Sequence, residues 1–144
     1  MNAIMRDAGH TIDQKIISMP YTVRHDRVLD IIEVIYISTM SKEDLLGATK
    51  EALALHRQTG TLRFLSDVSG AVSKASFLDL LQLAETQYDI EQLDRRCSHA
   101  IIPSQGKTGK NASQFFETAS LNRGWNTKVF SDRKSAIDWL LKSK

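Results

Sequence analysis

The segment Asn126-Thr127-Lys128-Val129-Phe130-Ser131-Asp132 leads directly into Ala136-Ile137-Asp138-Trp139-Leu140, and this stretch decides the fold. Its β-branched and aromatic residues predict a strand over 127–130. Ser131 or Asp132 can cap the next helix, which carries Ala136, Ile137, Leu140 and Leu141. Upstream, Ala100-Ile101-Ile102 and Phe115-Phe116 mark another strand and helix. The C-terminal half therefore reads strand, helix, strand, helix, the order of an α/β sandwich.

The N-terminal half begins with a predicted antiparallel hairpin. Residues 21–24 and 28–38 are rich in β-branched and aromatic side chains, and His25-Asp26-Arg27 provides turn residues between them. Ser41-Lys42-Glu43-Asp44 resembles a capping box, which predicts a helix over 42–58 that ends at Gly60. Residues 62–66 form a short apolar strand, and Asp67-Val68-Ser69-Gly70 is expected to end it as a turn.

The remaining elements are predicted from further cap and periodicity signals. Ser76 and Asp79 repeat the capping pattern ahead of an amphipathic helix over 77–88, and residues 98–102 give the next strand. After a loop over 103–110, apolar spacing from Ala112 marks a helix that ends at Gly124. The predicted order is ββαβαβαβα, a single-domain α/β sandwich with a mixed, mostly parallel sheet.

Composition supports one ordinary globular domain. The chain has 144 residues, 42% hydrophobic and 25% charged, and its net charge of +2 indicates neither a nucleic-acid partner nor a membrane surface. Its one cysteine excludes an intramolecular disulfide.

The most apolar run, 31–37, is far shorter than the roughly 20 residues of a spanning helix. We expect a polar leader over 1–18, a domain over 19–144, and a cytoplasmic protein without stable membrane insertion.

Two segments resemble the SpoIIAA-like proteins, which share the STAS fold and are related to Sec14 or CRAL-TRIO-type lipid-binding domains. They are Phe64-Leu65-Ser66-Asp67-Val68-Ser69-Gly70 and the stretch from Gly124-Trp125-Asn126 to Leu140. The resemblance covers roughly residues 21–141. It implies a bacterial binding or regulatory module, with a lipid-type pocket as an expectation from the fold alone.

The resemblance also implies a possible phosphorylation switch. Antagonist STAS proteins begin their second helix with an Asp-Ser-Ser-Gly type motif whose serine is phosphorylated, and phosphate can disrupt a docked interface. This chain reads Lys74-Ala75-Ser76-Phe77 there, without the aspartate or the glycine. Ser76, with Ser69 as a second candidate, could carry the phosphate, while Ser76 equally suits the N-cap of the helix.

Two polar segments are candidates for ligand contact. One is a loop that comes after a strand and opens a helix, and it contains Ser104, Gly106, Lys107, Thr108, Gly109 and Lys110. Anions or lipid headgroups can bind at such a position, although the spacing of the glycines and lysines is not that of a P-loop. A solvated polar loop is the alternative. Asp67 lies at the predicted strand end, where α/β proteins often bind ligands. With Ser69 it could instead bond turn backbone groups.

Cys97 and His99 are two residues apart, so on a strand both would point to one face and could form a nucleophilic pair. No third orienting group is evident, and a buried core role fits Cys97. The scattered histidines lack metal-ligand spacing, and no cofactor motif is present. The sequence therefore favours a non-enzymatic module that binds a partner protein or an apolar ligand. We expect the helices over 77–88 and 112–121 to border the pocket for such a ligand. The alternative is a phosphoregulated anti-sigma-factor antagonist, and a homodimer is compatible with either.

Overall fold

A computed structural model describes residues 20–73 and 77–142. The chain folds as an α/β protein around a five-stranded sheet. The elements, in chain order, are β1 (Tyr21–Asp26), β2 (Ile31–Met40), α2 (Lys42–Thr59), β3 (Arg63–Ser73), α3 (Phe77–Gln82), the π-helical segment η1 (Leu83–Gln87), α4 (Tyr88–Ile90), β4 (Ser98–Ile102), α5 (Gly106–Asn122), β5 (Asn126–Val129) and α6 (Arg133–Lys142). The predicted hairpin and the alternation of helices and strands after it are confirmed.

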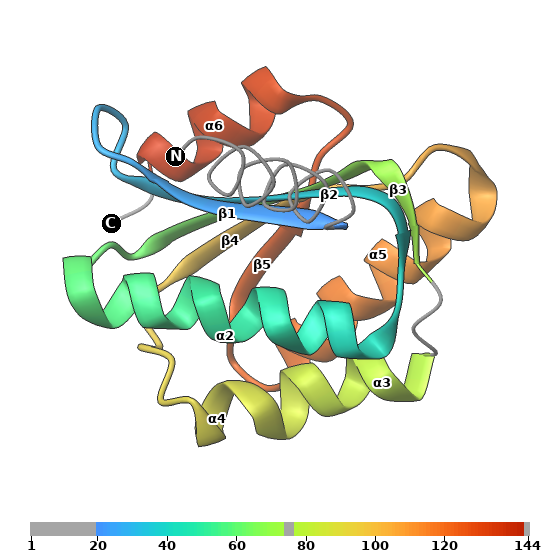
Figure 1. The fold of residues 1–144 in the computed structure, drawn as a ribbon, viewed down its shortest axis with the longest axis horizontal. Helices are drawn as coiled ribbons and strands as arrows, with labels where there is room; N and C mark the ends of the chain where they lie inside the picture. The colour runs from blue at the N-terminus through green and yellow to red at the C-terminus, as the bar shows by residue number, and fades with distance from the viewer. Residues whose placement is uncertain (1–19, 74–76, 143–144) are drawn as a thin grey trace, which may run out of the picture.

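The strands lie in the order β1-β2-β3-β4-β5, with β1 and β2 antiparallel and the remaining neighbours parallel. Each parallel pair is joined by a helical connection that moves in the same direction across the sheet. Because such crossovers are right-handed, their helices all fall on one face. Figure 1 shows α2, α3 and α4 on that face and α6 on the other.

Side chains alternate between two apolar layers, as the period of a strand requires. Ile32, Val34 and Tyr36 of β2 face the layer under the crossover helices. The second layer is smaller and lies under α6, where Leu65 and Ala100 pack against Ala136 and Leu140. The larger layer also borders a cavity.

The predicted helix caps are confirmed where the structure describes them. The Ser41 hydroxyl accepts a hydrogen bond from the Asp44 amide, and the Asp44 carboxylate accepts one from the Ser41 amide. Gly60 ends α2 with φ of +75°. Asp132, rather than Ser131, caps α6 by accepting from the amide of Ser135. The hairpin turn lies later than predicted, because His25 and Asp26 still belong to β1.

The prediction that residues 67–70 end the third strand is wrong. β3 continues to Ser73 because it pairs with the end of β2 as far as Met40. The pairing advances three residues along β3, from Asp67 to Gly70, while it advances two along β2, from Ile35 to Ile37. Residues 67–70 therefore form a β-bulge inside the strand. A bulge bends the strand locally, so residue types that favour turns also suit it.

The prediction of a loop through Lys110 is also wrong, since α5 begins at Gly106. The hydroxyl of Ser104 lies 3.0 Å from the carbonyl oxygen of Val68 and 2.8 Å from that of Ala71, so it bonds the bulged part of β3. A Cβ on Gly109 would come within 2.5 Å of Ser104 Cβ and 2.9 Å of its carbonyl oxygen. This glycine is therefore explained by the close approach of the first turn of α5 to Ser104.

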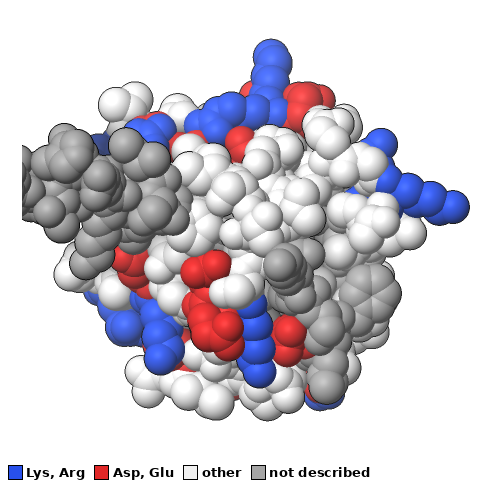
Figure 2. All heavy atoms as spheres, turned by 45° about the vertical axis from the view of Figure 1, so that its right-hand side comes forward, with Lys and Arg blue, Asp and Glu red and all other residues white. Residues whose placement is uncertain are grey.

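The surface carries charges of both signs. On the face in Figure 2, lysine and arginine atoms are interspersed with aspartate and glutamate atoms around an uncharged area, and the described residues there form no continuous basic surface. None of the helices within residues 20–73 and 77–142 has the length and apolar character needed to cross a bilayer. The predicted leader, 1–18, lies outside the described residues.

Candidate ligand-binding cavity

A cavity of about 120 Å³ lies between the sheet and the helices α2 to α5. Most of its wall is apolar or aromatic, including Leu53, Phe64, Leu83 and Phe116. The second and third predicted helices border it, as the sequence predicts, through Leu80, Tyr88, Ala112 and Phe116 of their predicted stripes, and Leu83 and Ser113 line it as well. These stripes therefore border an internal space as well as contributing to the core.

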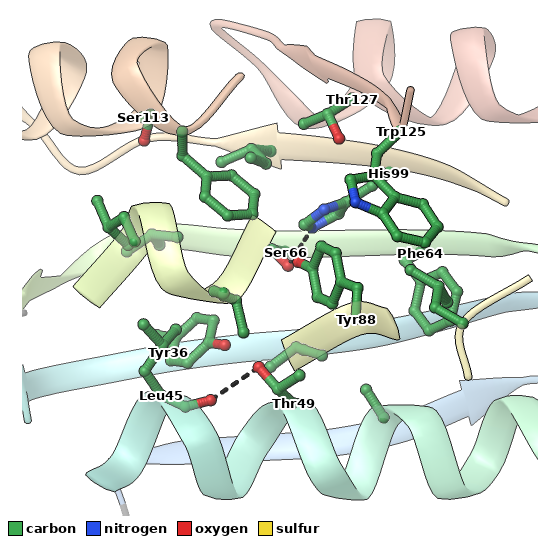
Figure 3. A pocket seen from close by; sticks show the side chains of 18 of the residues that line it. Tyr36, Leu45, Thr49, Phe64, Ser66, Tyr88, His99, Ser113, Trp125 and Thr127 are labelled. Carbon is green, nitrogen blue, oxygen red and sulfur yellow. Dashed lines mark hydrogen bonds between the residues drawn. The ribbon is translucent and has the colours of Figure 1, made fainter. Parts of the chain in front are cut away.

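A hydrogen-bonded pair lies on the sheet side of the cavity. His99 Nε2 is 2.7 Å from the hydroxyl oxygen of Ser66 on the neighbouring strand. The His99 ring makes edge-to-face contacts with Phe64 and Phe116, at centroid distances of 6.5 Å and 6.1 Å. Burial lowers the pKa of His99 to about 4, so the imidazole is neutral at pH 7. Figure 3 shows this pair beside the aromatic side chains of the cavity wall.

Two tyrosines reach the same space from opposite sides. Tyr36 comes from β2, and Tyr88 comes from α4 (Figure 3). Burial is the main reason that the pKa of each phenol is raised, and the nearby Tyr36 adds to the rise at Tyr88. Both are therefore uncharged hydrogen-bonding groups inside an apolar environment.

The helix before Tyr88 contains one π-helical turn, η1. Its wider turn is seen in the hydrogen bond from the Tyr88 amide to the carbonyl of Leu83, five residues back. The carbonyl of Ala84, within this turn, accepts a hydrogen bond of 2.8 Å from Trp125 Nε1. Single π-helical turns are frequent at functional sites. Here the turn sets the direction of Tyr88 and anchors Trp125, both of which line the cavity.

Cys97 and His99 point to one face, as their spacing predicts, and both line the cavity, but they are not a bonded pair. Cys97 Sγ lies 3.9 Å from Nδ1 of His56, whose shorter contact, 2.8 Å, is to the carbonyl of Thr61. Burial raises the pKa of the Cys97 thiol to about 12, which keeps it protonated. The described geometry places Cys97 in the core.

The other predicted site residues lie apart from the cavity. Asp67 is inside β3, where its carboxylate accepts hydrogen bonds from the amide and hydroxyl of Ser69, the local bonding that the sequence suggests. Lys107, Thr108 and Lys110 lie at the start of α5, and both lysines are exposed. Ser76 lies outside the described residues. Phosphorylation at Ser69 or Ser76 and anion binding at α5 stay predictions.

Sequence reasoning missed Tyr36, Ser66 and Tyr88 as site residues, because each falls inside an apolar strand or helix stripe. The sequence pairs His99 with its near neighbour Cys97, whereas its hydrogen-bond partner Ser66 is on another strand. The available signal was chemical: a tyrosine within a core stripe brings a hydroxyl that needs a partner. Within the described ranges, histidine, cysteine and acidic side chains form no cluster suited to a metal ion.

The low pKa of His99 makes the stability of the protein depend on pH. The ordinary value is 6.5, so lowering the pH protonates this histidine first in the unfolded chain. The free energy of unfolding is therefore unaffected by protonation of His99 above pH 6.5. It falls as the pH is lowered from 6.5 to about 4, by on the order of 3 kcal/mol in total. Urea unfolding across this range should show a steeper loss for the wild type than for His99→Gln. Equal slopes would contradict the expectation.

The arrangement of the sheet and helices is similar to the crystal structure of an uncharacterized protein from the DUF3478 family with a SpoIIAA-like fold, from Shewanella loihica PV-4. The two chains are 20% identical, and the match covers 83% of this chain and 91% of that chain with a TM-score of 0.52. The chain therefore has a SpoIIAA-like fold, as its sequence predicts. No family model and no curated protein matches it. At this identity the likeness defines the fold alone.

Proposed function

We propose that this protein is a non-enzymatic module that binds a small, largely apolar molecule in the cavity between the sheet and α2 to α5. The observation that carries the proposal is a mostly apolar cavity of about 120 Å³ whose wall includes the side chains of Tyr36 and Tyr88. Apolar protein cavities of about 150 Å³ bind benzene. A ligand the size of a single ring therefore matches the volume of this cavity.

Binding is favoured over catalysis by the surroundings of the Ser66 and His99 pair. A serine bonded to a histidine can act as nucleophile and base when a third group orients the ring. Among the described residues, no hydrogen bond involves His99 Nδ1, and Ser66 lies within a strand. The pair therefore serves in our proposal as a polar part of the ligand-binding wall.

Toluene is a suitable first probe, and the two tryptophans of the chain report on it separately. Trp125 lines the cavity, whereas Trp139 packs with Phe130 against the layer under α6. In an NMR titration we expect toluene to shift the indole N–H signal of Trp125 and to leave that of Trp139 unchanged. Absence of a Trp125 shift at saturating toluene would refute the proposed function.

A substitution that fills the cavity should remove the binding. Ala112 lines the cavity on α5, so Ala112→Leu places added carbons in the ligand space and should weaken toluene binding at least about ten-fold, the effect of about 1.4 kcal/mol. Gln114→Leu adds an apolar side chain to the exposed side of the same helix and should leave the affinity unchanged. If the Ala112→Leu protein bound toluene as tightly as the wild type, toluene would bind outside this cavity.

A further inference from the structure

The phenol groups of Tyr36 and Tyr88 are buried beside the cavity. Only 5% and 7% of these residues is exposed, and both line the cavity. Among the described residues, neither hydroxyl takes part in a hydrogen bond. Buried tyrosine hydroxyls usually have a partner, because an unmet polar group in an apolar environment costs free energy. Each hydroxyl has a proton to donate, and among the described residues neither is bonded to the acceptor oxygens of the wall, such as those of Thr49, Ser113 and Thr127.

The charge of the cavity restricts which acceptor on a ligand could bind these hydroxyls. The described lining residues include no lysine, arginine, aspartate or glutamate. Their titratable groups are Tyr36, Tyr88, Cys97 and His99, and all four are neutral at pH 7. A carboxylate in this space would be buried without a counter-ion, which is strongly unfavourable. A neutral acceptor avoids this cost.

Tyr88 borders this space from α4, whereas Tyr36 and the Ser66–His99 pair border it from the adjacent strands β2, β3 and β4 of the sheet (Figure 3). A ring-sized molecule in the cavity can therefore place one polar atom toward the hydroxyls while its carbons contact the aromatic wall. A carbonyl oxygen suits this position because it has two lone pairs and no charge.

We propose that Tyr36 and Tyr88 donate hydrogen bonds to a carbonyl-type acceptor on the bound molecule, so that the cavity selects an uncharged ring-sized ligand and discriminates against the corresponding carboxylate. This inference rests on the proposed function and adds the chemical class of the ligand. The tyrosines act as specificity-determining residues, and the apolar wall supplies the remaining affinity.

Three probes of nearly equal size and shape test the inference: acetophenone, cumene and benzoate. At pH 7 acetophenone is expected to shift the Trp125 signal, whereas benzoate is not. Tyr36→Phe and Tyr88→Phe should each lower the affinity for acetophenone about five-fold, the effect of one hydrogen bond. The affinity for cumene, which has no acceptor, should stay within about two-fold because the aromatic wall is kept. Tyr21→Phe, on β1 and outside the cavity lining, is the matched control.

The outcomes separate this inference from the proposed function. If toluene binds but neither tyrosine variant affects acetophenone, or benzoate binds as tightly as acetophenone, the inference is overturned and the cavity remains an unselective apolar site. If neither toluene nor acetophenone shifts Trp125, the proposed function fails and this inference fails with it.

Discussion

Removing both arginines that pair with Glu33 is expected to destabilise the protein by about 3–5 kcal/mol, because a buried carboxylate would lose its counter-ions. Glu33 is 2% exposed on β2. Its Oε1 lies 2.7 Å from Nη2 of Arg24, the residue opposite it on β1, and Oε2 pairs with Arg133 at the start of α6. Neither oxygen accepts a well-aligned hydrogen bond from the described residues, so the stabilisation comes from charge pairing.

Chemical denaturation of Arg24→Met/Arg133→Met would measure this effect. Adding Glu33→Met to the double variant should restore most of the lost stability, since an apolar group of similar volume can replace a buried ion pair. Lys134→Met removes the exposed Lys134–Asp138 pair and should change stability little. A double variant as stable as the wild type would contradict the assigned role of the two arginines as counter-ions of Glu33.

Leu65→Ala is expected to lower the free energy of unfolding by about 2–5 kcal/mol, through lost burial and the void left behind. Leu65 lies on the central strand with 0% exposure and packs with Ile31 and Leu140 under α6. Leu141→Ala is the matched control, because Leu141 on α6 is 42% exposed and its truncation should cost no more than about 0.5 kcal/mol. Equal losses in thermal or urea unfolding would contradict this assignment of the core.

The face on which Leu65 lies also predicts that its truncation spares the binding site. Its side chain belongs to the layer under α6, whereas its neighbours Phe64 and Ser66 line the cavity on the other face. The folded fraction of Leu65→Ala should therefore bind toluene with unchanged affinity.

Much of the fold could be predicted from local sequence. The start of α2 is predicted by the capping box at Ser41 and its end by Gly60. The strands β2 and β4 are predicted by their own apolar runs. The extension of β3 could not be predicted in this way. Asp67 and Ser69 have the same residue types and the same short-range hydrogen bonds in a bulge as in a turn. Pairing with residues 37–40, a contact between distant segments, decides between the two.

The cavity could be predicted only in part. Helical periodicity correctly indicates which faces of α3 and α5 point inward, but periodicity does not report whether the inward side chains meet or leave a space. The contact between Ser66 and His99 depends on the register of two parallel strands. Likewise, Tyr36 and Tyr88 are far apart in the chain, and only the folding of the helices over the sheet brings them to one cavity.

The π-helical turn at Leu83–Gln87 holds one residue more than an α-helical turn would. If the turn closed to α-helical geometry with all its residues kept, the residues after it would rotate by about 100° around the helix axis and Tyr88 would leave the cavity. Loss of one residue there would instead restore the α-helix and keep Tyr88 in its present orientation, because the wider turn compensates for the extra residue. In this fold, the wider turn is thus what lets the segment hold one additional residue and still direct Tyr88 to the ligand space.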